Sequence, residues 1–97
     1  MTEGKFYVNE TVFPHTVVLC TQADTGNGFF AGFVCSYNSV DEVGLFSNEW
    51  IIECFKLVEE KDIIEDIREA IPSLEYKQLK GEQILLLHRL KKIVESY

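Results

Sequence analysis

The sequence lacks several features that would assign it to a class of protein. It contains no internal repeat and no low-complexity segment. Residues 1–5 have no apolar run of the signal-peptide kind, and no segment approaches the ~20 apolar residues needed to span a bilayer. We therefore expect a soluble, cytoplasmic protein that does not act at a membrane.

Cysteine is also scarce, with Cys20, Cys35 and Cys54 as the three examples in 97 residues. An odd number inside apolar runs favours buried, reduced thiols over a disulfide framework. The spacings leave no close pair of ligands, even with His15 and His88, so we predict no metal site and no cofactor. A Cys20–His15 nucleophile is disfavoured because burial in an apolar strand raises a thiol pKa.

Positive charge is in deficit. Nine Lys and Arg stand against sixteen Asp and Glu, which gives a net charge of −7. This charge repels phosphate backbones and anionic lipids, so nucleic acid is not an expected ligand. The basic residues Arg89, Lys91 and Lys92 are interpreted as charges that favour the C-terminal end of a helix.

What the sequence does contain divides at about residue 58. Residues 1–58 are rich in Val, Phe, Tyr, Thr and Gly with frequent turn residues, which predicts short antiparallel strands. Residues 59–97 change to helical periodicity. We predict one α+β domain over residues 1–97, formed by a small antiparallel SH3-like β-barrel or strongly bent sheet and two C-terminal α-helices packed on it.

The strands are predicted at residues 6–8, 16–21, 29–37, 43–46 and 55–58. The run Val17, Val18, Leu19, Cys20 is apolar at consecutive positions, as in a strand covered on both faces. Gly32, in the middle of "FFAGFVCSY", predicts a bulge or a sharp bend.

The triplet Asp24-Thr25-Gly26 matches the catalytic triplet of aspartic proteases. Asn27-Gly28 follows it, and this pair is favoured where a hairpin requires positive φ. The chain lacks the glycine-rich flap and the second supporting motif of those enzymes, and a dyad would require two such loops to meet in a homodimer. We interpret the triplet as part of a hairpin turn and predict that the protein has no catalytic residues.

Residues 47–58 fit a helix or a strand. We predict that Ser47 caps one or two helical turns through about Cys54, before the last strand. Here the sequence resembles small phage- and mobile-element-encoded proteins with an SH3-like barrel, over about residues 16–59. The matched positions are Phe30, Gly32, Val34, Gly44, Ser47, Trp50 and Phe55. The resemblance implies a fold but no shared enzymatic activity.

The first helix is predicted to start at Asp62, which forms an acidic capping box with Glu65, and to end at Pro72. Ser73 can cap a second segment, in which Gly81 is either a break or an interior glycine. An apolar stripe at steps of three and four residues follows, with a second stripe of Ile84, Leu87 and Val94 beside it. The first of these stripes also includes the polar Gln83. We predict that its other residues form a partner-binding stripe, which consists of Leu79, Leu86, Leu90, Ile93 and Tyr97.

Two functions are compatible with these features. The first is a small acidic protein-interaction module without catalytic activity that binds a host protein or a second copy of itself through the last helix. The resemblance implies that a phage or mobile element encodes it. The second is a small-ligand-binding domain or enzyme subunit. Its pocket would lie at the barrel mouth, lined by Tyr7, Tyr37 and Trp50.

Overall fold

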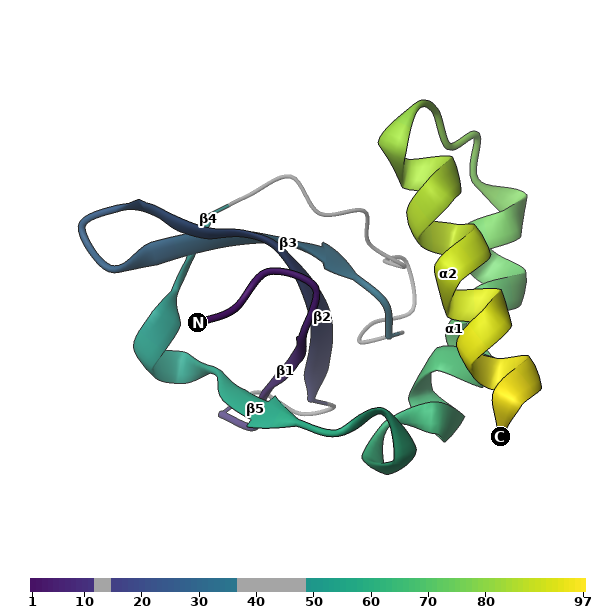
Figure 1. The fold of residues 1–97 in the computed structure, drawn as a ribbon, viewed down its shortest axis with the longest axis horizontal. Helices are drawn as coiled ribbons and strands as arrows, with labels where there is room; N and C mark the ends of the chain where they lie inside the picture. The colour runs from purple at the N-terminus through teal and green to yellow at the C-terminus, as the bar shows by residue number, and fades with distance from the viewer. Residues whose placement is uncertain (12–14, 37–48) are drawn as a thin grey trace.

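The computed structural model describes residues 1–11, 15–36 and 49–97, and it confirms the predicted α+β class. A curved antiparallel sheet forms one half, and a pair of antiparallel helices stands against its outer side (Figure 1). The strands are β1 (Phe6–Asn9), β2 (Thr16–Gly26), β3 (Phe29–Val34), β4 (Glu49–Ile51) and β5 (Lys56–Val58). The helices are the 3-10 turns η1 (Ile52–Cys54) and η2 (Glu60–Asp62), followed by α1 (Ile64–Tyr76) and α2 (Glu82–Ser96).

The five strands lie in the order β4-β3-β2-β1-β5. The last strand returns to the first, with Phe6 opposite Val58 and Val8 opposite Lys56. Within the described residues β4 and β5 are the two edges, and the sheet is not closed into a barrel. Of the two architectures that the sequence predicted, the open, bent sheet describes this arrangement.

Strand β2 is buried on both faces from Thr16 to Cys20, as its consecutive apolar residues predicted, and is half-buried or exposed from Thr21 to Gly26. Val17 and Leu19 belong to a core shared with both helices, whereas Val18 and Cys20 belong to a second core on the opposite face. Side chains alternate across a strand, so one apolar run supplies both layers. The first core is made of Phe6, Val8, Val17, Leu19, Phe33, Cys35, Ile63, Ile67, Ala70, Leu74, Leu87, Leu90 and Ile93.

The predicted hairpin connects β2 and β3 through Asn27 and Gly28. Both have positive φ, 55° and 79°, as a type I′ turn requires. The triplet with Asp24 lies at the end of β2 instead of in the turn itself, and Asp24 Oδ1 accepts a hydrogen bond from the Gly26 N–H at 2.8 Å. Asp24 is exposed, and its carboxylate stabilises the strand end next to the turn.

Gly32 lies beside a register shift between β2 and β3. Cys20 pairs with Gly32 while Gln22 pairs with Ala31, so Thr21 is an extra residue on β2. A Cβ atom on Gly32 would lie 2.9 Å from the Leu19 carbonyl oxygen. The glycine therefore permits the close approach of the two backbones where the sheet bends, as the sequence indicated.

Residues 49–54 differ from the prediction. Glu49–Ile51 form strand β4, and only Ile52–Cys54 form a helical turn. Trp50 is held in the strand by pairing with Phe30, and its ring packs on that residue at a centroid distance of 5.6 Å. The closing strand at β5 is confirmed, whereas Tyr37, the strand predicted at 43–46, and the Ser47 cap lie outside the described residues.

The helices also require two corrections. The capping box is formed by Glu59 and Asp62 around η2, and α1 begins at Ile64, so the predicted box with Glu65 is wrong. Pro72 lies inside α1 and does not end it. The missing N–H costs one backbone hydrogen bond, but Leu74, beyond the proline, is fully buried, and its burial offsets that cost. Gly81, with φ 58°, separates α1 from α2.

We expect Gly32→Ala to destabilise the fold by about 1–3 kcal/mol, because the new methyl group meets backbone and not a movable side chain. Urea unfolding followed by circular dichroism measures the change. Gln22→Ala, at an exposed site on the paired strand, is the control and should change stability little. Equal stability of Gly32→Ala and the parent chain would contradict the tight approach.

Candidate functional site

The structure divides the predicted partner-binding stripe. Leu90 is fully buried and Ile93 nearly so, both in the core that α2 shares with the sheet. Leu79 and Leu86 are half-buried against that core, and Tyr97 is 63% exposed. Most of the stripe therefore attaches α2 to its own domain, and a partner cannot reach Leu90 without opening the core.

The exposed apolar side chains of α2 lie elsewhere. Leu85 is 70% exposed and Ile84 is 43% exposed, both in the first turn of the helix. The sequence predicted two neighbouring apolar stripes on this segment. It could not identify Leu85 as the residue left uncovered, because that depends on how α2 is rotated against the sheet.

Leu85 lies at the rim of a cleft of about 340 Å³. The cleft lies between α2 on one side and β2 with the N-terminal segment on the other, and Leu19 and Leu86 are among its apolar lining residues. Its charged lining consists of Glu3, Glu82 and Arg89. Four of the lining residues, Glu82, Leu85, Leu86 and Arg89, recur at three- and four-residue spacing and so occupy one face of the helix.

Arg89 holds the N-terminal segment against the helix. Its Nη2 donates a hydrogen bond to the Gly4 carbonyl oxygen at 2.6 Å, and its guanidinium lies 5.8 Å from the centre of the Phe6 ring. Lys91 pairs with Glu75 of α1 at 2.9 Å. These two basic residues therefore make contacts between elements, which corrects the interpretation that they serve only the end of the helix.

Backbone hydrogen bonds fix the opposite wall of the cleft. The Gly4 N–H donates to the Cys20 carbonyl at 2.8 Å, and the Cys20 N–H donates to the Lys5 carbonyl at 2.9 Å. The N-terminal segment thus continues alongside β2 before β1 begins. These bonds hold the backbone of the N-terminal wall in place beside β2.

The two described residues of the predicted ligand pocket, Tyr7 and Trp50, belong to an aromatic cluster on the inner face of the sheet. Phe30 lies between them, 6.5 Å from the Tyr7 ring and 5.6 Å from the Trp50 ring, and Phe55 packs edge-on against Phe30 at 4.8 Å. Tyr7 is buried, and its hydroxyl accepts a hydrogen bond from the Thr2 N–H at 2.8 Å. In these positions the rings serve as a second core.

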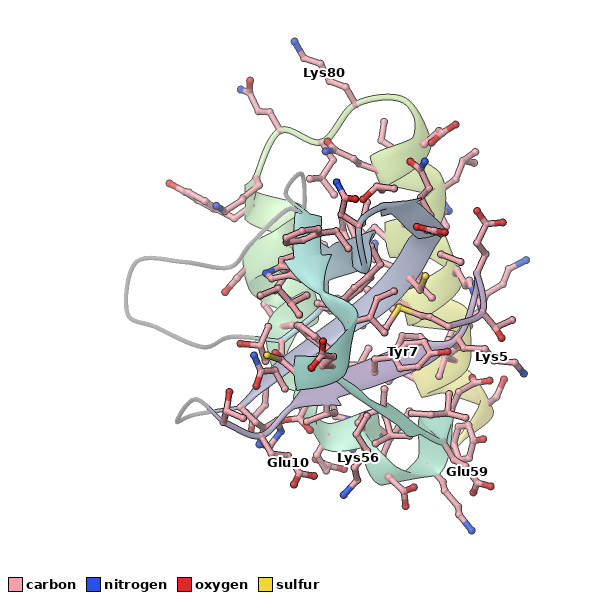
Figure 2. All side chains as sticks on the ribbon, turned by 90° about the vertical axis from the view of Figure 1, so that its left-hand side faces the viewer. Lys5, Tyr7, Glu10, Lys56, Glu59 and Lys80 are labelled. Atoms are coloured by element: carbon pink, nitrogen blue, oxygen red, sulfur yellow. The ribbon has the colours of Figure 1, made fainter. Side chains whose placement is uncertain are left out.

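A second cleft, of about 520 Å³, lies next to β5 and α1 and has both apolar and charged residues in its lining. On its lining, His15 Nε2 is 3.2 Å from Asp66 Oδ1, and Glu10 pairs with Lys56 at 3.0 Å. Figure 2 shows Glu10, Lys56 and Glu59 along this side of the molecule, with Tyr7 in the interior and Lys80 at the far end of the helical hairpin. The His15–Asp66 pair joins the segment before β2 to α1, whereas the Glu10–Lys56 pair joins the end of β1 to β5 within the sheet.

The three cysteines are free thiols, but they differ in environment. Burial raises the pKa of Cys20 and of Cys35, and the Cys35 thiol donates a hydrogen bond to the Val17 carbonyl at 3.5 Å. Cys54 in η1 is exposed, which corrects the expectation that all three are buried. Cys20 and His15 were weighed as a nucleophile and base, but the ring of His15 is engaged with Asp66.

Comparison with protein-family models, with curated proteins and with solved structures found no match for this chain. Within residues 1–11, 15–36 and 49–97, no group of three or more His, Cys, Asp or Glu side chains is placed to hold a metal ion. No helix in the same ranges has the length and apolar character to cross a membrane.

We expect a thiol reagent to modify Cys54 rapidly in the native protein and to leave Cys20 and Cys35 unmodified, because the reactive species is the thiolate and burial disfavours it. Titration with the reagent should therefore detect one reactive thiol per chain before unfolding and three after unfolding. The folded variant Cys54→Ser should show no reactive thiol. Rapid modification of two or three thiols in the parent protein would contradict the burial of Cys20 and Cys35.

Proposed function

We propose that this protein is a small, acidic, non-catalytic protein-interaction module of the cytoplasm, which binds its partner through the first turns of α2. The observation that carries the proposal is the exposure of Leu85, 70%, at the rim of a cleft with apolar walls. Leu85 faces away from both hydrophobic cores, and Ile84 in the same turn is also exposed.

The exposed apolar area of Leu85 is a source of binding free energy. Burying a leucine side chain contributes about 1.5–3 kcal/mol, and Leu85 retains most of that contribution for a partner. A side chain at the centre of a contact, next to a pocket and surrounded by charges, has the arrangement in which a few residues dominate binding. Glu3, Glu82 and Arg89 supply that charged rim.

Other features support a protein partner and a non-catalytic function. The net charge of −7 opposes binding to nucleic acids and anionic membranes. The Asp24 carboxylate accepts a hydrogen bond from Gly26 at the end of β2. Cys20 and Cys35 have raised pKa values, which disfavour the nucleophilic thiolate. Three free cysteines suit the reducing environment of the cytoplasm.

The proposal includes a fold relationship. We infer that the sheet is an opened form of the SH3-like barrel of small phage- and mobile-element-encoded proteins. Two features support this inference: β5 returns to pair with β1, and only η1 and Phe55 separate β4 from β5, so the sheet edges are joined by a short connection. An experimental structure with β4 and β5 directed away from each other would contradict it.

The interaction is tested with tagged protein exposed to lysate of its native host. We expect one protein, either a host protein or an untagged copy of the chain, to be captured in stoichiometric amount. We expect Leu85→Glu to lose it, because a carboxylate at the centre of the contact would have to be desolvated. Mass spectrometry with quantified band intensities provides the measurement. Leu90 is unsuitable for this test because a charge at its buried position would unfold the core.

Gln78→Glu is the matched control, since it adds the same charge at an exposed position outside the α2 face. It should retain the captured protein, and both variants should keep the thermal unfolding profile of the parent chain. Capture that Leu85→Glu leaves unchanged would overturn the proposed surface. Loss of capture by both variants would assign the effect to net charge and would also contradict the proposed surface.

A further inference from the structure

The binding face of α2 has an internal symmetry that identifies an occupant. In the order Glu82, Leu85, Leu86, Arg89, the acidic and basic residues stand three positions outside the two leucines. All four line the same cleft. Glu82 and Arg89 are seven residues apart, close to two helical turns, so they lie on one face about 10.5 Å apart along the axis.

We infer that the partner of this face is a second copy of the chain, bound with the two α2 helices antiparallel. A twofold axis between Leu85 and Leu86 places Glu82 of each copy opposite Arg89 of the other, and it places the leucines at the centre. The inference rests on the proposed function, because it uses the same surface and names its occupant. A twofold contact requires a self-complementary patch, which this arrangement supplies.

The charges of the described residues are compatible with this register. Glu82 has no ion-pair partner among residues 1–11, 15–36 and 49–97. Arg89 donates through Nη2 to the Gly4 carbonyl, and a guanidinium has five donors, so it retains donors for a carboxylate. A parallel arrangement in the same register would place glutamate beside glutamate and arginine beside arginine, so the charges select the antiparallel one.

The cleft provides space for side chains of the second copy. Leu85 of one copy projects at the rim, and the cleft beside it extends over Gly4 and Thr21 to the apolar wall at Leu86. The overlap spans about eight residues of each helix, or roughly 12 Å. This is a small interface, and each chain carries −7, so the dimer is a weak one that forms at high concentration.

Sedimentation equilibrium of the full chain from about 10 µM to about 1 mM tests the inference. We expect the mass to rise from monomer to dimer over this range. Leu85→Glu should remain monomeric, whereas Gln78→Glu should dimerise like the parent chain. A parent chain that stays monomeric at every concentration would overturn the inference.

Two charge variants test the register. Glu82→Arg and Arg89→Glu each place like charges opposite one another, so each alone should dimerise roughly five- to tenfold more weakly than the parent. Mixed in equal amounts they should form a heterodimer, because both contacts then join opposite charges. A parent dimer without this recovery would contradict the antiparallel register.

Arg89→Glu also removes the contact with Gly4, so its fold is checked by circular dichroism. If it does not fold, the double variant Glu82→Arg, Arg89→Lys replaces it and should be as weakly dimeric as Glu82→Arg alone. The outcomes separate this inference from the proposed function. A monomer that still captures a host protein through Leu85 would overturn only the dimer, whereas a dimer that captures nothing else would restrict the proposed partner to a second copy.

Discussion

The structure depends on the burial of β2 on both of its faces. Val17 and Leu19 face the helices, whereas Val18 and Cys20 face the aromatic cluster. The two hydrophobic cores therefore share this strand, and each depends on its position. This constraint determines the position of the remaining elements. The helices must cover one face, and the N-terminal segment, Trp50 and Phe55 must cover the other. A chain of this length has little other apolar surface from which to build a core.

The same constraint determines which residues of α2 are available for binding. Three of its apolar residues, Leu87, Leu90 and Ile93, are needed to seal the helix-facing core. An α-helix has one face toward its own domain, so apolar residues in excess of that face remain at the surface. Leu85 is such a residue. It lies one helical turn before Arg89 on the same face, and Gly4, which is bonded to Arg89 and to Cys20, brings a second wall to that face.

The corrections have a common physical origin, which is the competition between local preference and burial. Pro72 is a strong local signal for a helix end, yet α1 continues because Leu74 completes the core beyond it. Trp50 fits a helical pattern as well as a strand, and it lies in a strand because it pairs with Phe30 of β3. Cys54 is in an apolar sequence context, but the tight turn of η1 turns it to the surface. For Pro72 and Trp50 the deciding contact joins residues that are distant in the sequence, whereas a local turn decides the exposure of Cys54.

The sequence by itself determined the α+β class, the division near residue 58, the hairpin at Asn27-Gly28, the bend at Gly32 and the two-sided burial of β2. These features follow from residue-level conformational preferences and from apolar periodicity, which are local. Only the tertiary structure decided that the sheet stays open, that Leu90 is core while Leu85 is surface, and that Arg89 holds the N-terminal segment. Periodicity defines the faces of a helix, but their orientation depends on how α2 is rotated against the sheet, and the packing of the whole chain sets that rotation.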